Sequence, residues 1–387
     1  MNVPKLRFKE FNDEYKYRNL SDISTLIKDG THGTHENYEN GIPLLSAKDI
    51  NNNKINIPED CRKISVDDYN KIYKNYLLKK DDILLTIVGS IGRTALYKNE
   101  KVAFQRSVAT IRIDDNNNSN YIRQYIESPI IINQLNNMTN SSAQGGVYLS
   151  SLSKLNFDIP RKEEQLKVAK FLSLLDKKIE LQFKKIEDLK LFKKGLHDKL
   201  FNEVTGNDYL LSDIAVFENG KGHENIIDEN GKYILINSKF ISTEGNVTKK
   251  CSEQLTPLFK NDITMVMSDL PNGKALAKCY YIDENNKYSL NQRICKIKVK
   301  DDSIINSKYL FYLLNRNSYY LRFDDGVNQT NLKKDDILSL NLVLPSIKEQ
   351  ERDSKTLTII DNFIEKENNK LSKLFLLKKG LMQSMFV

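Results

Sequence analysis

The strongest constraint on the fold is a heptad stripe of apolar residues that occurs twice in the chain. In the first copy the apolar positions alternate in steps of three and four, at Leu172, Leu175, Ile179, Ile186, Leu189, Leu196 and Leu200. Adding 185 to each number gives the second copy, at Leu357, Ile360, Ile364, Leu371, Leu374, Leu381 and Met385. Polar residues interrupt both stripes at the same two places, Gln182 and Lys193 in the first and Glu367 and Lys378 in the second. Stripes of this length, free of proline, are typical of coiled coils.

A single stripe of this kind is also compatible with an amphipathic helix that packs on its own domain. Two stripes in the same register favour a pairing between them, because each supplies the partner that the other needs. We therefore expect one intramolecular coiled coil. Because a whole domain separates the two helices, an antiparallel arrangement is sterically reasonable.

The sequence outside the helices is duplicated as well, with separations that vary from about 180 to about 191 residues. The matching segments are Leu20–Ile23 with Leu211–Ile214, Lys48–Ile50 with Lys239–Ile241, Gln105-Arg106 with Gln292-Arg293, Gly146-Val147 with Gly326-Val327, Leu152 with Leu332, and Leu155–Pro160 with Leu340–Pro345. Variable separations indicate loops that were inserted or deleted between shared elements. We infer two copies of one globular fold.

Each copy mixes short apolar runs, which predict strands, with helical stretches. The runs 83–88, 108–113 and 294–299 are predicted strands, and 121–137 and 306–322 are predicted helices. The fold class is therefore α/β (α+β), with two tandem globular domains that are each followed by a long helix. The expected boundaries are 1–16 for an N-terminal arm, 17–160 for domain 1, 161–204 for helix 1, 205–345 for domain 2 and 346–387 for helix 2.

Composition narrows the class of protein. The 387 residues contain no run of about 18 apolar residues and begin without the apolar stretch of a secretion signal, so we expect a cytoplasmic protein with no membrane partner. The four cysteines are scattered, which predicts reduced thiols and no metal or disulfide framework. A net charge of +8 favours a polyanionic partner only weakly.

The predicted helices have the dimensions of a spacer. At 1.5 Å per residue, the stripe from Leu172 to Leu200 spans roughly 42 Å. That length corresponds to about 12 base pairs of B-DNA. A rod that holds one domain at each end would fix the distance between two reading heads, as dimeric repressors do for their half-sites.

Several motifs resemble the target recognition domains of specificity (S) subunits of type I restriction–modification systems. The resemblance covers nearly the whole chain, including the order domain, helix, domain, helix. Its motifs are Asp29–Thr34, Ile42–Ile50, Gly89–Arg93 and Ala143–Leu149 in the first copy, and Met267–Lys274 and Leu290–Arg293 in the second. The second domain is shorter and lacks a clear counterpart of Asp29–His32, and Gly220–His223 stands near the equivalent place.

The resemblance implies a function and a set of partners. Each recognition domain would read one half of a bipartite target in double-stranded DNA, and the helices would set the spacer between the halves. The helices would also dock two methyltransferase (M) subunits, and restriction (R) subunits would join the full complex. No cofactor is expected in this chain, because S-adenosylmethionine, ATP and Mg²⁺ would bind to those partners.

DNA binding requires cations for phosphates and amide, guanidinium or hydroxyl groups for base edges. Domain 1 offers Thr31, His32, His35, Lys48, Ser90, Arg93, Arg106, Gln144 and Tyr148. Domain 2 offers Lys221, His223, Lys239, Asn272, Lys274, Gln292, Arg293, Asn328, Gln329 and Asn331. A solvated loop side chain or a structural hydrogen bond is the alternative role for each. His32 and His35 lack a third ligand, so we do not expect a metal site there.

Two other function classes compete with DNA reading. A methyltransferase or nuclease would carry catalytic motifs such as an Asn/Asp-Pro-Pro-aromatic loop, and the chain has no adjacent prolines and no P-loop. We therefore expect a non-catalytic subunit. A coiled-coil scaffold that binds only proteins is the other alternative, and it predicts no salt-dependent DNA affinity.

Overall fold

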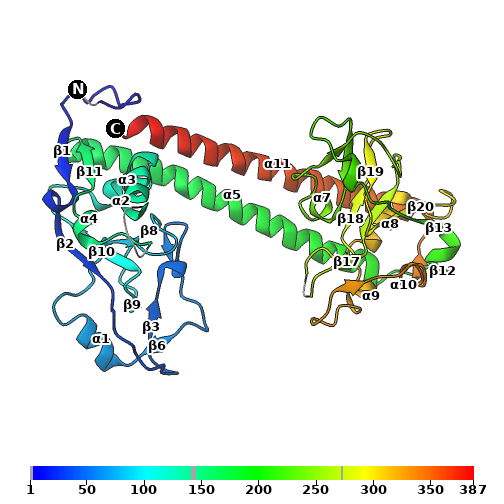
Figure 1. Ribbon diagram of the computed structural model, residues 1–387, viewed down its shortest axis with the longest axis horizontal. Coiled ribbons are helices and arrows are strands. Elements are labelled where there is room, and N and C mark those ends of the chain that lie inside the picture. Colours follow the sequence, from blue (N-terminus) through cyan, green and yellow to red (C-terminus); the bar gives the residue numbers. More distant parts are fainter. Residues whose placement is uncertain (1–2, 141–144, 272) are drawn as a thin grey trace. The chain divides into compact units, whose positions relative to one another are not determined.

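The computed structural model describes residues 3–140, 145–271 and 273–387. The chain forms two compact units, and each contains one globular domain together with part of both long helices (Figure 1). Unit 1 comprises Met1–Lys185 and Glu367–Val387, and unit 2 comprises Ile186–Lys366. The long helices are α5, Lys162–Asn202, and α11, Ile347–Met385.

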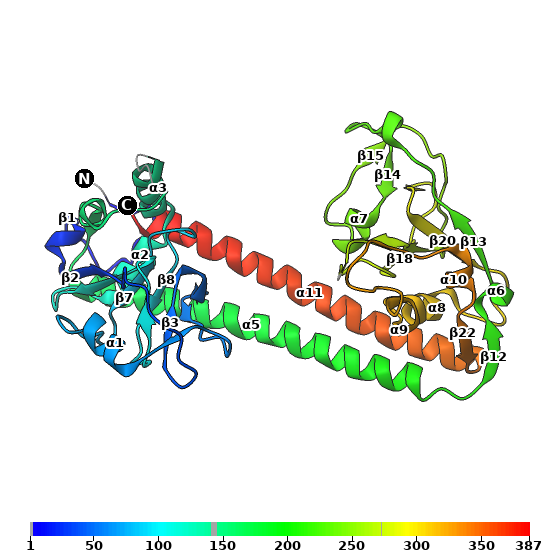
Figure 2. The ribbon, with the colours of Figure 1, turned by 60° about the horizontal axis from the view of Figure 1, so that its bottom comes forward.

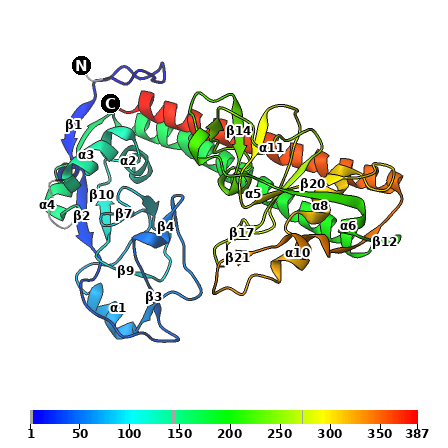
Figure 3. The same ribbon diagram turned by 45° about the vertical axis from the view of Figure 1, so that its right-hand side comes forward.

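The core of unit 1 is built on an antiparallel sheet with strand order β2-β10-β7-β8, of which Figure 3 labels β2, β10 and β7. Its strands are β2 Ser24–Asp29, β10 Val108–Ile113, β7 Ile83–Thr86 and β8 Thr94–Leu96. All four residues of β7 are buried, because this strand lies inside the sheet and is covered on both faces. The predicted strands at 83–88 and 108–113 are therefore confirmed, the first one ending two residues early.

Smaller sheets and short helices surround this sheet. A three-stranded sheet has the order β6-β3-β9, and β1 pairs with β11. Their bounds are β6 Lys63–Ile64, β3 Ile42–Leu45, β9 Ala103–Phe104, β1 Lys16–Asn19 and β11 Asn156–Ile159. A two-stranded ribbon consists of β4 Ile50–Asn51 and β5 Lys54–Ile55. The helices are α1 Val66–Ile72, α2 Ser119–Ile126, α3 Pro129–Asn140 and α4 Leu149–Leu152. The predicted helix at 121–137 is thus two helices, broken before Pro129.

Unit 2 repeats this topology (Figure 2). Its antiparallel sheet has the order β13-β20-β16-β18, its three-stranded sheet the order β15-β14-β19, and β12 pairs with β22. The bounds are β13 Ala215–Asn219, β20 Ile294–Val299, β16 Ile263–Val266, β18 Cys279–Tyr281, β15 Lys250–Cys251, β14 Tyr233–Ile236, β19 Tyr288–Leu290, β12 Asn207–Leu210 and β22 Asn341–Leu344. The matching strand orders confirm the predicted duplication.

The remaining elements of unit 2 are short. They are α6 Leu211–Ile214, α7 Ser238–Ser242, α8 Ser307–Leu314, α9 Ser318–Leu321, α10 Lys334–Leu338, β17 Ser268–Asp269 and β21 Thr330–Asn331. The helix predicted at 306–322 is again two helices. Asn317 ends the break between them and caps α9 by accepting a hydrogen bond from the N–H of Tyr319.

The structure corrects part of the sequence repeat. The N–H of Val147 donates to the carbonyl of Ile87 at 2.8 Å, and the N–H of Leu332 donates to the carbonyl of Met267 at 2.8 Å. Leu332 is therefore the counterpart of Val147 and not of Leu152. The predicted match of Gly146-Val147 with Gly326-Val327 is wrong for the same reason, since it would place Val327 where Leu332 stands.

The two long helices pair through the predicted seam. No described seam position is exposed, and Leu172 and Ile186 are almost completely buried. In unit 1, Lys378 lies 2.6 Å from Asp176, and the amide of Gln182 donates to the carboxylate of Glu367 at 2.6 Å. Because the partner number on α11 falls as the number on α5 rises, the helices are antiparallel in this unit, as predicted.

The polar interruptions of the seam are thus paired with each other or with neighbours. In unit 2, Lys193 lies 2.5 Å from Asp361, whose other carboxylate oxygen accepts a hydrogen bond from the hydroxyl of Tyr312. Lys193 and Asp361 are the sequence counterparts of Lys378 and Asp176. The same ion pair therefore occurs once in each unit.

The end of α11 completes the core of unit 1. Met382, Met385 and Phe386 belong to the same cluster of buried residues as the central sheet. The ring of Phe386 stacks on that of Tyr125, with centroids 4.6 Å apart and planes inclined by 23°. The N-terminal arm lies against the same helix end, since the N–H of Leu6 donates to the carbonyl of Ser384. A segment far away in the sequence is therefore part of this domain's core.

The arm is also tied to the start of α5. Arg7 forms an ion pair with the buried carboxylate of Glu164 at 2.8 Å, and the hydroxyl of Tyr15 donates to the same carboxylate. A buried carboxylate needs such partners, because removing it from water is unfavourable unless its oxygens are paired. The arm thus supplies charges that the start of α5 requires.

Two predictions concern the cysteines and membrane-spanning helices. All four cysteines are free, and burial raises the pKa of Cys295 to about 12, so this thiol stays protonated at neutral pH. Among the described residues, no helix is long and apolar enough to cross a membrane.

The stacking of Phe386 predicts that unit 1 depends on the end of α11. We expect Phe386→Ala to lower the free energy of unfolding of unit 1 by about 3–5 kcal/mol, the usual loss for a buried aromatic. Phe375→Ala on the same helix is the control, because Phe375 is 53% exposed and its loss should change stability by about 0.5 kcal/mol or less. Hydrogen exchange of the α2 amides, measured during urea denaturation, reports the stability of unit 1 in both variants. Equal losses of stability would contradict the role assigned to Phe386.

The seam carboxylate predicts a dependence of stability on pH. Hydrogen bonds from Gln182, Lys370 and Lys185 lower the pKa of Glu367 to about 2. The folded state therefore binds fewer protons than the unfolded state between pH 4.5 and pH 2, so its stability falls as the pH falls through this window. We expect the stability difference between the wild type and Glu367→Gln to shrink across it in urea titrations. A difference that stays constant with pH would refute the pairing.

Candidate nucleic-acid interface

In unit 1, backbone hydrogen bonds bring together loops that are distant in the sequence. The N–H of Thr31 donates to the carbonyl of Phe104 at 2.9 Å, and the N–H of Arg106 donates back to the carbonyl of Thr31 at 3.0 Å. Gly30 permits this approach, because a Cβ atom there would lie 2.1 Å from the carbonyl oxygen of Phe104. Thr31, His32 and Arg106 are therefore neighbours.

Ser107 connects two further loops to this pair. Its carbonyl accepts a hydrogen bond from the N–H of Ile87 at 2.9 Å, and its hydroxyl accepts one from the N–H of Ala47 at 3.0 Å. The carbonyl of Ile87 in turn accepts from the N–H of Val147. Lys48 and Tyr148 directly follow the contact points Ala47 and Val147, and Ser90 lies three residues after Ile87. The loops that carry most of the predicted residues of domain 1 therefore converge.

One residue in this convergence was missed by the sequence analysis. The guanidinium of Arg93 donates to the side-chain carbonyl of Asn51 at 2.5 Å, and the amide nitrogen of Asn51 donates to the carbonyl of Lys48 at 2.6 Å. Asn51 thus links two predicted residues. It stands in a run of three asparagines, which gave no signal that distinguished it.

The two histidines of the first loop have different surroundings. His32 is exposed and lies 2.6 Å from the carboxylate of Asp29. The ring of His35 is mostly covered, with one nitrogen 2.8 Å from the hydroxyl of Thr31 and the other 3.4 Å from the carboxylate of Asp68. His32 is therefore available to a ligand, whereas His35 holds the loop. Tyr148 is 51% exposed, and Gln144 lies outside the described residues.

Unit 2 brings the corresponding loops together. The N–H of Gln292 donates to the carbonyl of Lys221 at 3.0 Å, and the N–H of Asn291 donates to the carbonyl of Ile236 at 3.0 Å. Gly220 permits this approach as Gly30 does in unit 1, since a Cβ atom there would lie 2.0 Å from the carbonyl oxygen of Asn291. Lys221, Gln292 and the start of α7, which carries Lys239, are thus adjacent.

Two more segments of unit 2 join these loops. The N–H of Met267 donates to the carbonyl of Arg293 at 3.1 Å, and β17 pairs with β21. The amide of Gln329 donates to the hydroxyl of Ser268 at 2.7 Å. Asn328, Asn331 and Lys274 lie on the same segments and are exposed. Asn272 lies outside the described residues.

The hydrogen bonds also correct the match between the two domains. The N–H that donates to the carbonyl of Thr31 belongs to Arg106, and the N–H that donates to the carbonyl of Lys221 belongs to Gln292. Gln292 is therefore the counterpart of Arg106, and Arg293 is the counterpart of Ser107. The predicted match of Gln105-Arg106 with Gln292-Arg293 is wrong by one residue, because the identical residues occupy structural positions that differ by one.

His223 is a second correction. It is only 1% exposed, with one ring nitrogen 2.7 Å from the carbonyl of Lys221 and the other 2.7 Å from the hydroxyl of Ser289. Both nitrogens are used inside unit 2, so the ring has no surface to offer to DNA. The sequence placed it in a polar loop, where burial could not be foreseen.

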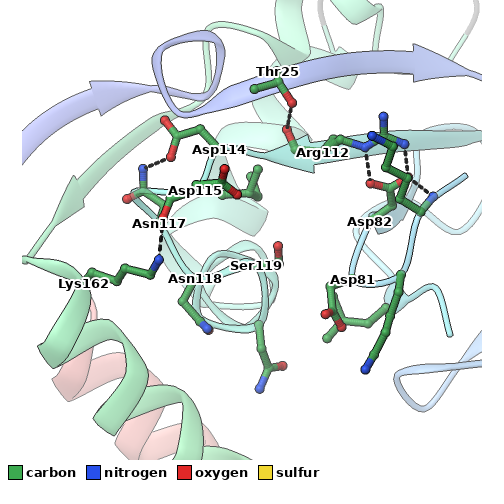
Figure 4. A pocket seen from close by; sticks show the side chains of 15 residues that line it. Thr25, Asp81, Asp82, Arg112, Asp114, Asp115, Asn117, Asn118, Ser119 and Lys162 are labelled. Atoms are coloured by element: carbon green, nitrogen blue, oxygen red, sulfur yellow. Dashed lines mark hydrogen bonds and ion pairs between the residues drawn. The ribbon is translucent and has the colours of Figure 1, made fainter. Parts of the chain in front are cut away.

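One hollow of unit 1 is lined by residues outside these loops. It has a volume of about 590 Å³ and is lined by residues of β10, of the loop before β7 and of the start of α2 (Figure 4). Arg112 pairs with Asp82 at 2.7 Å, and the ammonium group of Lys162 donates to the carbonyl of Asp115. The lining also includes the carboxylates of Asp81, Asp114 and Asp115, which would repel a DNA phosphate.

The converging loops carry the groups that nucleic acid requires. Lys48, Arg93, Arg106 and His32 in unit 1 and Lys221, Lys239, Lys274 and Arg293 in unit 2 are exposed. Cations of this kind bind phosphates, while amides and guanidinium groups bind base edges. Among the described residues, no group of three His, Cys, Asp or Glu side chains could hold a metal ion.

Comparison with known proteins agrees with this arrangement. The type I restriction modification DNA specificity domain family matches the chain twice, over residues 12–191 and 206–375. The chain is 22% identical to the "Putative type I restriction enzyme MjaX specificity subunit" of Methanocaldococcus jannaschii, across 98% of this chain and 95% of that protein. It is 28% identical to the type I restriction enzyme EcoBI specificity subunit of Escherichia coli, across 35% of this chain and 28% of that protein.

Two solved structures have the same fold. The S subunit of a type I restriction-modification system from M. genitalium matches with a TM-score of 0.63 and 16% identity, across 100% of this chain and 99% of that chain. A chain from a structure of type I R-M complex assembly matches with a TM-score of 0.58 and 13% identity, across 96% and 97% of the two chains.

Proposed function

Because this chain belongs to the type I restriction modification DNA specificity family, we propose that it is the DNA-reading subunit of a type I system. Each unit reads one half of a bipartite target in double-stranded DNA, and the paired helices set the spacer between the two halves. The chain performs no catalysis itself. It acts in the cytoplasm, as part of a complex that modifies DNA.

The observation that carries this proposal is the duplicated convergence of loops. The same backbone hydrogen bonds hold the loops in both units, yet the exposed side chains differ between them. Two copies of a binding frame with different side chains suit two different half-sites. A scaffold that binds only proteins would have no need for cations and amides gathered in this way in both domains.

The contacts divide into two kinds on chemical grounds. Lysines such as Lys48, Lys221 and Lys239 are compact charges, and we assign them to phosphates. Planar groups that can form two parallel hydrogen bonds, such as Arg93 and Gln329, are assigned to base edges. His32 lies beside Asp29 and is assigned to a phosphate or sugar contact.

Membership of the family supports our proposal for the partners and cofactors. Two M subunits bind the helices, and R subunits join the restriction complex. S-adenosylmethionine, ATP and Mg²⁺ are bound by those partners and not by this chain. The contribution of this chain to methylation is to hold the target base within reach of the active site of a partner subunit.

The helices carry an exposed apolar doublet at the same place in each copy. Leu191 and Phe192 on the unit 2 part of α5 are 71% and 61% exposed, and Leu376 and Leu377 on the unit 1 part of α11 are 69% and 52% exposed. The doublets are 185 residues apart, as the seams are. Exposed apolar groups outside the seam are typical of protein interfaces, and their duplication suits two copies of one partner.

Methylation sequencing tests the proposed function. Cells that express this chain with the M subunit of its system should acquire methylated adenines in a split motif with a gap of fixed length, because two readers are held by one pair of helices. The same cells with the M subunit alone are the control. A stable complex that produces no new methylation would favour the protein scaffold instead.

The doublets predict the stoichiometry of the complex. Replacing both Leu376 and Leu377 by Ser should weaken the binding of one M subunit about 100-fold, since two buried leucines contribute about 3 kcal/mol. Native mass spectrometry should then detect one bound M subunit in place of two. Replacing both Leu191 and Phe192 by Ser should remove the other copy.

The exposed pair Asn368 and Asn369 on α11 provides the matched control, because replacing both by Ser removes no apolar surface. Two bound M subunits in every variant would show that the doublets are not the docking surface.

A further inference from the structure

Arg106 and Gln292 occupy the same place on the same frame. In both units the N–H of this residue donates at 3.0 Å to the carbonyl of the loop residue after a tightly packed glycine, which is Thr31 in unit 1 and Lys221 in unit 2. The neighbouring residues also make matching backbone hydrogen bonds in the two units. They are residues 105 and 107 in unit 1 and residues 291 and 293 in unit 2. The position is therefore fixed by main-chain bonds that do not involve its side chain.

The side chains at this position are free to meet a ligand. Both are exposed. Within the described parts of unit 1, the guanidinium of Arg106 has no hydrogen-bond or ion-pair partner. The amide of Gln292 donates one hydrogen bond to the carboxylate of Glu224. That bond uses one N–H and leaves the oxygen and the second N–H of the amide unused, so its orientation is set while its recognition groups remain available.

The change from arginine to glutamine separates two possible roles. A phosphate contact common to both units would favour a cation at this position, because an uncharged glutamine can donate a hydrogen bond to a phosphate but adds no charge attraction. A position that reads bases is expected to change its side chain from one half-site to the other on a constant backbone. Arginine matches the two acceptors of guanine, O6 and N7, and glutamine matches the N6 donor and N7 acceptor of adenine.

We propose that Arg106 and Gln292 are equivalent specificity-determining positions, at which unit 1 reads a guanine and unit 2 reads an adenine. The inference rests on the proposed function, because it requires that each unit contacts one half-site. It adds to that function the class of base at one position of each half. The neighbouring Arg293 is the counterpart of Ser107 and is not part of this pair.

Reciprocal exchange tests the pair. The full chain, assembled with its M subunit, is used to select duplexes from a library randomised on both sides of the spacer. Arg106→Gln should change the preferred base at one position of one half-site from guanine to adenine, with a preference of about tenfold, and leave the other half-site unchanged. Gln292→Arg should produce the opposite change in the other half-site only.

Controls distinguish this result from trivial effects. Arg18→Gln replaces an exposed arginine on β1 and should leave both half-sites as in the wild type. Thermal denaturation shows whether each variant is folded. We expect both variants to fold, because neither side chain takes part in the backbone hydrogen bonds of the frame. If Arg106→Gln selects no motif at all, Arg106→Lys decides, because lysine keeps the charge but lacks the planar fork.

The outcomes are separable. Loss of discrimination at a single position in Arg106→Lys would support the proposal, and an unchanged motif would overturn it. An Arg106→Gln variant that keeps the wild-type motif, or that weakens binding to all sequences equally, would also overturn it, since both results describe a phosphate contact or no contact. A wild-type complex that enriches no split motif would instead refute the proposed function, and the inference with it.

Discussion

The hydrogen bond between Gln182 and Glu367 sets the register of the two long helices in unit 1. The two residues are counterparts in the repeat, 185 positions apart, and they contact one another in the seam. A shift of one turn would separate Glu367 from Gln182 and Lys185 on the other helix, which is unfavourable for a carboxylate at a buried seam position. Polar residues at seam positions specify register in coiled coils in this way.

The ends of the long helices pack into the cores of the globular domains. Phe386 stacks on Tyr125 in the core of unit 1, and Phe201 packs against Tyr309 in unit 2, with ring centroids 5.0 Å apart. Phe201 and Phe386 are again 185 residues apart. Each recognition domain therefore borrows part of its core from a helix end. Because cores are closely packed, a change in how the helix ends pack would also be felt by the core of each domain.

The sequence predicted most of what depends on periodicity and little of what depends on local contacts. The seam and the strand 108–113 were predicted correctly, because their apolar spacing reflects burial directly. The match of Arg106 with Arg293 was wrong, because identical residues in a short loop do not show which backbone N–H donates to which carbonyl. His223 was placed among the DNA contacts because a polar loop sequence does not show that its ring is enclosed. Asn51 was missed because its role is set by a contact with Arg93.

The separation of frame from side chain explains how a duplicated fold can serve two different half-sites. The main-chain bonds around Thr31 and Lys221 require glycine before each of them, because a Cβ atom at Gly30 or Gly220 would collide with a carbonyl oxygen. The side chains that project from the frame are under no such constraint. Substitutions at the projecting positions can then alter one reader without altering the fold or the other reader. A chain built in this way is expected to retain its glycines and its seam while its exposed loop residues diverge between the two units.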